Sequence, residues 1–234
     1  MATLKIPAIV LRQNAYRDND RMLTLLSPAL GRADVLARGC RRAKSPLLTA
    51  TELFATGEFL LYEKAGRYTL TSAEIHEAYY PLRLDYTLLE DAVFLLKLCQ
   101  TAAHVGQPAQ SLFLLLVRAL HFLSYRNTPP QAVLTAFLLT YADILGYCPQ
   151  INACVKCGKK RPSGAAAYFD EREGGIVCTQ CKGEGGTSMS GKNLKWMETV
   201  LTDGFETVEG LKAEDAPYTW MRRYVLSKIE RNDL

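Results

Sequence analysis

The sequence has no apolar run long enough to cross a membrane. Its longest apolar stretch, residues 112–123, is interrupted by Arg118 and His121, whereas a transmembrane helix needs about 20 residues. The residues before Arg12 also lack the apolar length of a secretory signal peptide. These absences predict a soluble, cytoplasmic protein.

Recognisable catalytic motifs are also missing. No GxSxG sequence frames a serine, and the three histidines, His76, His104 and His121, lie outside any HExxH pattern. Residues 186–193 nearly match a phosphate-binding P-loop. However, Asn193 stands where the Mg²⁺-binding Ser or Thr belongs, and a cysteine-rich segment precedes the motif where an apolar strand should be. The sequence therefore favours a binding protein over an enzyme.

The composition is that of an ordinary globular protein. Hydrophobic residues make up 48% of the 234 residues and charged residues 22%, which is enough for a core without disulfide cross-links. The formal net charge is +4, a mild basic excess that by itself only weakly favours a polyanionic partner.

The first 80 residues favour β-structure. Short apolar segments alternate there with turn signals at residues 28–31 and 64–67. We predict strands at residues 4–11, 21–26, 32–38, 51–63 and 68–75. Five short strands of this kind indicate a small barrel or a sandwich.

From residue 81 the apolar residues follow helical spacing. The first predicted helix runs through residues 88–99, and its N-cap is either Asp85 or Thr87, the latter in a capping box with Glu90. Further helices are predicted at residues 110–126 and 131–145, which form a compact bundle with the first, and at residues 191–202 and 217–231. Residues 147–186 have too few large apolar groups for a core of their own. The expected domains are therefore 1–80 and 81–234, with 147–186 inserted in the second.

Four of the seven cysteines form two matching pairs, Cys154-x-x-Cys157 and Cys178-x-x-Cys181. Two residues between thiolates let one tight turn aim both sulfurs at one ion, and two such turns supply the four ligands of a structural zinc site. A redox CxxC pair and two disulfides are the alternatives, but the βαβ pattern of a redox protein is absent. Four thiolates leave no open coordination position, so such a site is structural. Cys148 is out of phase with both pairs and is predicted to be a small buried hydrophobe.

A basic segment lies within the predicted β-domain. Its cations are Arg32, Arg38, Arg41, Arg42 and Lys44, with Arg12, Arg17 and Arg21 upstream. A basic strand and loop can follow a phosphate backbone, and exposed aromatic side chains, here Tyr16, Phe54 and Tyr62, can stack on bases. The alternative is an ordinary solvated loop. The last helix carries Arg222, Arg223, Lys228 and Arg231, which form either a second basic face or simply its solvated side.

The order of these motifs resembles the zinc-containing members of the RecO family of bacterial DNA repair proteins. The likeness is most specific from Leu145 to Cys181. It rests on Ile144-Leu-Gly-Tyr147, Cys154-x-x-Cys157-Gly, Tyr168-Phe169-Asp170, Gly174-Gly175 and Cys178-x-x-Cys181, and on the opening segments Ala8-Ile-Val-Leu11, Tyr16-Arg-Asp-Asn-Asp-Arg21 and Leu30-Gly-Arg32.

The resemblance implies an α+β protein: an N-terminal five-stranded OB-type β-barrel, then an α-helical domain with an inserted four-cysteine zinc module. It implies a recombination mediator that binds single- and double-stranded DNA, anneals complementary strands and, with RecR, helps load RecA onto strands coated by single-strand-binding protein. It also implies structural Zn²⁺, a nucleoid-associated location and an apolar pocket for that coating protein's acidic tail, near which Arg118 and Arg126 are candidates. The alternatives are a zinc-ribbon protein of transcription or RNA handling, and an enzyme such as a nuclease or NTPase.

Overall fold

The computed structural model describes residues 2–183 and 186–230. The chain divides into two compact units, Met1–Tyr125 and Arg126–Leu234, and each is described by itself. Within the described residues, no helix combines the length and apolar character needed to span a membrane.

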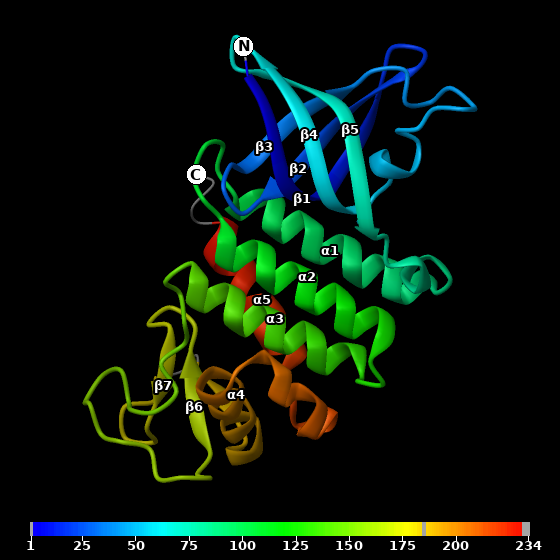
Figure 1. Cartoon of the computed structure of the whole chain (residues 1–234). Helices are drawn as coiled ribbons and strands as arrows, with labels where there is room; N and C mark the ends of the chain where they lie inside the picture. The colour runs from blue at the N-terminus through cyan, green and yellow to red at the C-terminus, as the bar shows by residue number, and fades with distance from the viewer. Residues whose placement is uncertain (1, 184–185, 231–234) are drawn as a thin grey trace. The chain divides into compact units, whose positions relative to one another are not determined.

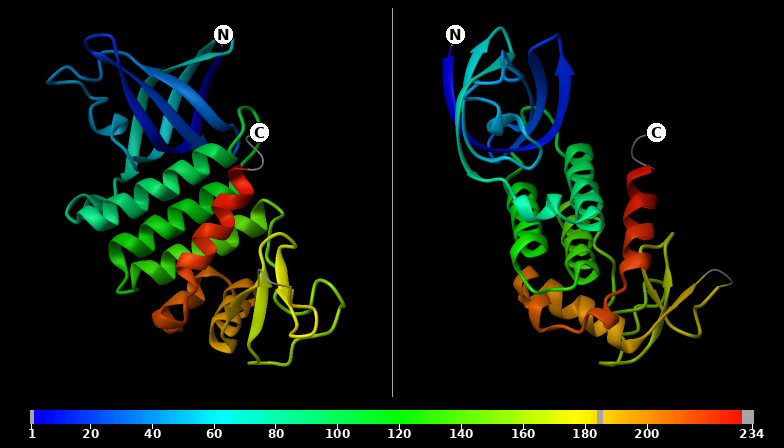
Figure 2. Two further views of the ribbon diagram at one scale, coloured as in Figure 1. Left: turned by 180° about the vertical axis from the view of Figure 1, so that it is seen from behind. Right: turned by 90° about the vertical axis from the view of Figure 1, so that its right-hand side faces the viewer.

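Five strands of the first unit close into a barrel (Figure 1). They are β1 (Ala2–Tyr16), β2 (Asp20–Ser27), β3 (Gly31–Ala37), β4 (Thr56–Lys64) and β5 (Arg67–Glu77). The strand order is β1-β2-β3-β5-β4, β4 pairs back onto β1, and β3 and β5 pair in parallel. The right-hand view in Figure 2 shows the strands curving round into a ring. The predicted barrel is therefore confirmed and the sandwich is excluded.

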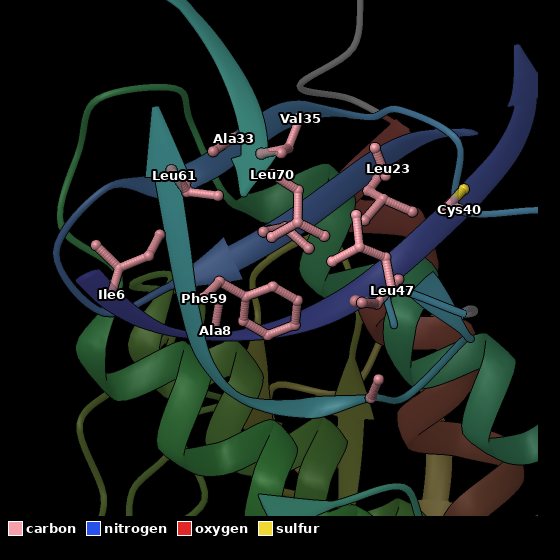
Figure 3. Packing of buried hydrophobic residues seen from close by; sticks show 14 residues of the cluster. Ile6, Ala8, Leu23, Ala33, Val35, Cys40, Leu47, Phe59, Leu61 and Leu70 are labelled. Carbon is pink, nitrogen blue, oxygen red and sulfur yellow. The ribbon is translucent and has the colours of Figure 1, made fainter. Parts of the chain in front are cut away.

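Alternate residues of the strands fill the barrel interior, because successive side chains of a strand point to opposite faces. Leu23 and Leu25 of β2, Val35 of β3 and Phe59 and Leu61 of β4 are all fully buried there. Figure 3 shows the side chains of Leu23, Val35, Phe59 and Leu61 converging inside the barrel. Some of the intervening residues, among them Asp34, Leu36 and Tyr62, remain at least partly exposed on the outer face, whereas others, such as Leu26, are buried.

A long loop, residues 38–55, joins β3 to β4 and corrects two expectations. Its residues Thr49–Thr51 form a 3₁₀ helix, so β4 begins at Thr56 and not at Thr51. Phe54 was expected as an exposed stacking platform, but it is only 1% exposed. Its backbone has a φ of 69° and its N–H donates to the Val10 carbonyl over 3.1 Å. Phe54 is therefore buried and cannot stack on a base.

The helices of the first unit are η2 (Tyr80–Arg83), α1 (Tyr86–Ala102) and α2 (Gln110–Tyr125). Asp85 is the N-cap of α1: its Oδ1 accepts the backbone N–H of Thr87 at 2.8 Å and of Leu88 at 3.1 Å. The alternative capping box at Thr87 is wrong, since Glu90 accepts the Tyr86 hydroxyl over 2.7 Å.

The second unit combines helices with a small sheet. Its elements are α3 (Pro130–Ile144), β6 (Ala167–Asp170), β7 (Gly175–Val177), β8 (Thr187–Met189), α4 (Gly191–Asp203), η3 (Phe205–Gly210), η4 (Ala213–Asp215) and α5 (Tyr218–Glu230). The buried helix α3 packs against α4, α5 and η3. The sheet has the order β7-β6-β8, and Figure 1 shows β6 and β7 in yellow. The predicted helices are confirmed; the predicted end at Arg231 lies outside the described residues.

Candidate metal centre and nucleic-acid groove

The four paired cysteines meet in space. The Sγ atoms of Cys154, Cys157, Cys178 and Cys181 all lie within 4.8 Å of one another, and those of Cys157 and Cys178 are 3.8 Å apart. In a tetrahedral zinc site with Zn–S bonds of ~2.3 Å, two sulfurs are about 3.8 Å apart. The cluster can therefore hold a metal ion, and its donor set suits zinc.

Each cysteine pair lies in a tight turn. The Gly158 N–H donates to the Cys154 carbonyl over 2.8 Å, and Gly158 has a φ of 72°, which favours glycine. In the second turn the Cys181 N–H donates to the Cys178 carbonyl over 3.0 Å. The Cys178 N–H points at the Cys154 sulfur, 3.4 Å away. The backbone thus aims donors at sulfur, as a thiolate cluster requires.

The pKa values of two of the clustered thiols are shifted in opposite directions. Backbone N–H groups of Cys178 and Cys157 lower the pKa of Cys154 to about 6. Hydrogen bonds to Cys178 and Cys157 raise the pKa of Cys181 to about 12. A divalent cation removes this conflict, because it is attracted to all four sulfurs at once. Cys148 lies outside this cluster: it is half-buried, and burial and the neighbouring Asp143 raise its pKa to about 11.

The metal module, residues 147–186, takes its apolar core partly from α5. The ring of Phe169 lies 4.2 Å from that of Trp220 and 5.5 Å from that of Tyr224, measured between centroids. Trp220 and Tyr224 stack, and the Tyr224 hydroxyl donates to the Tyr147 carbonyl over 2.9 Å. A segment too poor in apolar residues for its own core is thereby attached to a helix that supplies the missing rings.

Ionic contacts strengthen this attachment. Arg161, whose side chain is only 3% exposed, pairs with Glu198 of α4. Arg223 Nε donates to Glu171 over 2.8 Å, and Lys228 Nζ donates to the Glu171 carbonyl over 3.3 Å. Two of the basic residues on the last helix thus bind the metal module. Arg222 also has a partner, and Arg231 lies outside the described residues.

A groove of 1070 Å³ opens on the outer face of the barrel. The β1–β2 turn contributes Arg17, strands β2 and β3 contribute Met22 and Leu36, and the β4–β5 hairpin contributes Lys64 and Arg67. The β2–β3 face with the β1–β2 and β4–β5 loops is the surface that OB-type barrels use to bind oligonucleotides.

Cations and aromatic rings line this groove. Arg17, Arg38, Lys64 and Arg67 outnumber the acids Asp20 and Asp34, and the lining includes Tyr16, Tyr62 and Tyr68. Tyr16 is 40% exposed and Tyr62 37%. The Arg17 guanidinium lies 5.4 Å from the centroid of the Tyr16 ring. Exposed rings beside cations can receive both the bases and the phosphates of a single strand.

The β3–β4 loop carries Arg41, Arg42 and Lys44 and is called the basic loop from here on. It begins beside the groove. The Arg41 N–H donates to the Asn19 carbonyl over 3.0 Å, and the Gly39 N–H donates to Asp20 Oδ1 over 2.8 Å. These bonds fix the start of the loop to the β1–β2 turn. Arg41, Arg42 and Lys44 are exposed there, so they extend the cationic surface beyond Arg17 and Arg38.

The other three arginines of the predicted set lie elsewhere on the barrel. Arg12 and Arg32 line a separate hollow of 420 Å³, and Arg32 Nη1 donates to the Gln100 carbonyl of α1 over 3.2 Å. Arg21 Nη1 donates to Thr51 Oγ1 over 2.9 Å and to Glu52 Oε1 over 2.8 Å. We therefore assign Arg21 to holding the β3–β4 loop on the barrel.

Sequence reasoning missed three groove residues, Lys64, Arg67 and Tyr68. The segment from Lys64 to Arg67 was interpreted only as a hairpin turn. The two cations that flank this turn, in a chain expected to form an OB-type barrel, were the available signal, because the β4–β5 loop borders the binding face of that fold.

A closed five-stranded barrel with a cationic, aromatic-lined groove, followed by helices that carry a four-cysteine centre, defines a DNA-binding protein of the OB-fold class. The family model described as "Recombination protein O N terminal" matches residues 1–79, and "Recombination protein O C terminal" matches residues 83–232. The chain belongs to the RecO family of DNA repair and recombination proteins.

Curated relatives agree with this assignment. The chain is 30% identical over 236 residues to the DNA repair protein RecO of Alkaliphilus metalliredigens, covering 97% of this chain and 94% of the relative. It is 30% identical over 238 residues to that of Symbiobacterium thermophilum, covering 99% and 94%. It is 27% identical over 240 residues to that of Acetivibrio thermocellus, again covering 99% and 94%.

Proposed function

We propose that the chain is a recombination mediator that binds single- and double-stranded DNA and anneals complementary strands. The observation that carries this proposal is the barrel groove, whose lining includes Arg17, Arg38, Lys64 and Arg67 together with three tyrosines. A groove lined by cations and aromatic rings favours a polyanion that also presents flat bases.

The mechanism is electrostatic capture. Each cation that meets a phosphate releases condensed counterions, which favours binding at low salt. Two complementary strands repel each other, and the basic loop lowers this repulsion when it neutralises one of them. Stacking on a ring such as Tyr62 contributes ~1–3 kcal/mol per base. No bond is made or broken, so we assign no catalytic residue.

We propose that the metal is Zn²⁺ and that its role is structural. Cys154, Cys157, Cys178 and Cys181 would hold it as four thiolates, which saturate a tetrahedral ion. A closed site of this kind supplies folding free energy and no open position for a substrate.

We further propose that the chain acts with RecR to help load RecA onto strands coated by single-strand-binding protein, whose acidic C-terminal tail it would bind. Family membership supports these partners. Of the candidates for the tail pocket, Arg126 forms an ion pair with Glu209 at 3.6 Å and Arg118 also has a partner. A protein with these partners is expected in the cytoplasm, associated with the nucleoid.

Charge reversal in the basic loop tests whether the cationic surface beside the groove takes part in DNA binding. We expect Arg41→Glu with Arg42→Glu to weaken binding of a fluorescent single strand at least tenfold and to flatten the log–log salt dependence by about 1.4, the slope for two phosphate contacts. The control is Lys5→Glu with Lys97→Glu, which makes the same charge change at two exposed lysines outside the groove. Equal loss in both variants would mean that net charge alone matters and that the loop is no part of the site.

A strand-annealing assay tests the activity itself. The protein should accelerate pairing of complementary strands, both bare and coated, and the loop variant should lose most of this acceleration. Tight binding without annealing, together with a preference for RNA, would instead identify a protein of transcription or RNA handling.

A further inference from the structure

A second hollow lies beside the groove on the outer face of the barrel. It has a volume of 420 Å³, and we call it the arginine hollow because Arg12 of β1 and Arg32 of β3 line it together with Gln100 of α1. Met22 and Asp34 line both this hollow and the groove. The two cavities therefore share a wall, and a chain molecule that leaves the groove on this side enters the hollow.

Strand pairing places both cavities on one continuous face of β1, β2 and β3. One row of paired residues across these strands reads Arg12–Thr24–Asp34, and the next row reads Asn14–Met22–Leu36. Residues two apart on a strand point to the same side. Tyr16 of the groove therefore lies on the same face of β1 as Arg12 of the hollow, four residues and about 14 Å away. A single strand can follow this face from the tyrosine to the arginine.

The two arginines of the hollow keep most of their donors for a ligand. Arg32 Nη1 donates to the Gln100 carbonyl over 3.2 Å, and Arg12 Nε donates to Asn14 Oδ1 over 3.3 Å. Each bond uses one of the five N–H donors of a guanidinium group. Among the residues that the structure describes, neither arginine forms an ion pair with Asp34. Two positive charges thus line the hollow without an acid to neutralise them.

The shared wall has a different chemistry from the cavities on either side. Asp34 Oδ1 accepts the Thr24 hydroxyl over 2.9 Å, which fixes the carboxylate on the outer face. This negative charge repels a phosphate, but its oxygens can accept an N–H from the edge of a base. Met22 adds apolar surface beside it, opposite Leu36. The wall therefore suits a base, whereas the cations of the groove and of the hollow suit phosphates.

We propose that the arginine hollow is a second subsite for the single strand that occupies the groove. A phosphate beyond the groove binds Arg12 and Arg32, and the base next to it lies over Met22 and donates an N–H to Asp34. The inference rests on the proposed function and extends it, because the strand then continues past the barrel groove to a wall supplied by α1.

Oligonucleotide length provides the test. The affinities of wild type and Arg12→Gln are compared for a series of oligothymidylates of increasing length. Strands that fill only the groove should bind both proteins equally. Strands long enough to reach the hollow should bind Arg12→Gln about tenfold more weakly, because a charge-assisted contact is lost. For these long strands the log–log salt dependence should flatten by about 0.7, the slope for one phosphate contact, and by about 1.4 when Arg32→Gln is added.

The matched control is Lys5→Gln, which removes one charge from the same strand at an exposed residue that lines neither cavity. It should change the binding of long strands no more than that of short ones. Arg12 is exposed and its bond is to a near neighbour, Asn14, so Arg12→Gln should unfold at the wild-type denaturant concentration.

The possible results separate this inference from the proposed function. If Arg12→Gln matches wild type at every length, or weakens all lengths alike, the second subsite is refuted while the groove still binds DNA. A similar loss in Lys5→Gln for long strands would also refute it, since net charge would then explain the effect. Wild-type protein that binds no single strand would overturn the proposed function and this inference together.

Discussion

The barrel and the metal module are stabilised in different ways. In the barrel, closure pairs every strand on both sides, and alternating side chains such as Leu25 and Phe59 fill the interior. In the metal module, the strands are three or four residues long, Phe169 packs on rings from α5, and four cysteines gather for an ion. One region is stabilised by its own burial, whereas the other packs on a neighbouring helix and gathers four cysteines that can hold a metal ion.

This difference indicates which region carries the activity. A barrel that fills its own interior leaves its outer face available, and the groove with Arg17, Arg38 and Lys64 lies on that face. The metal module uses charged residues for structural contacts: Lys156 pairs with Asp170 within the module, and Arg161 pairs with Glu198 of α4. We therefore regard the barrel as the DNA-binding region and the metal centre as structural support.

The largest expected effect comes from removing a metal ligand. Cys178→Ser should lose the metal and destabilise the second unit by roughly 5 kcal/mol or more, since structural zinc contributes apparent binding free energies of ~10–16 kcal/mol. Metal analysis and thermal unfolding measure both effects. Cys148→Ser, outside the cluster, should keep the metal. Folded wild-type protein without zinc would refute the assignment of the thiols.

Truncation of a core side chain should destabilise the barrel and leave the metal content unchanged. Phe59→Ala removes a fully buried ring and should cost about 3–5 kcal/mol, while the metal content stays at that of the wild type. Tyr62→Ala, three residues along the same strand and exposed, should barely change stability but should weaken single-strand binding by ~1–3 kcal/mol. Chemical denaturation and binding titrations separate the two. Metal loss in Phe59→Ala would mean that the regions are not independently stabilised.

A glycine pair tests how tightly the barrel is packed at one turn. Gly31 has a φ of 63°, and a Cβ there would lie 2.2 Å from the Gln107 carbonyl oxygen. We expect Gly31→Ala to cost about 3 kcal/mol, the strain of a left-handed alanine at ~1–2 kcal/mol plus the clash. Gly66 has a φ of 73° but open space around it, so Gly66→Ala should show the backbone strain alone. Similar losses in denaturant unfolding would show that the contact is not tight.

The smallest expected effect concerns the stability of the protein at acidic pH. Burial alone would raise the pKa of Glu77, but the N–H groups of Tyr79 and Ala78 and the Tyr125 hydroxyl outweigh it and hold the pKa below its usual 4.5. The charged form thus adds stability above pH 4.5 that disappears as the pH falls through the lowered pKa. Glu77→Gln should lower stability at neutral pH and reduce its fall in acid, as measured by unfolding at each pH. An unchanged pH profile would remove Glu77 from this role.

Local sequence patterns were sufficient to predict those features of the structure whose physical cause is local. Alternation of apolar residues predicted the strands, and the cysteine spacing predicted the cluster. The short strands β6, β7 and β8 went unpredicted because three or four residues are too few to show alternation.

Other features depend on pairings between distant segments, which no local pattern contains. Arg21 looked like a surface cation, but strand alternation turns it toward Thr51 and Glu52, thirty residues along the chain. Phe54 was expected to be exposed within the strand predicted at residues 51–63, but it precedes β4 and is buried. Arg67 and Tyr68 lie beside Leu36 of the groove because β5 pairs in parallel with its neighbour β3.

Photocrosslinking of the full chain to a single strand containing bromodeoxyuridine tests most directly where DNA binds. Aromatic side chains stacked on bases should crosslink most readily, and the attached peptides can be sequenced by mass spectrometry. The account predicts attachment at Tyr16, Tyr62 or Tyr68, the rings that line the barrel groove. Crosslinks confined to the second unit, Arg126–Leu234, would contradict it.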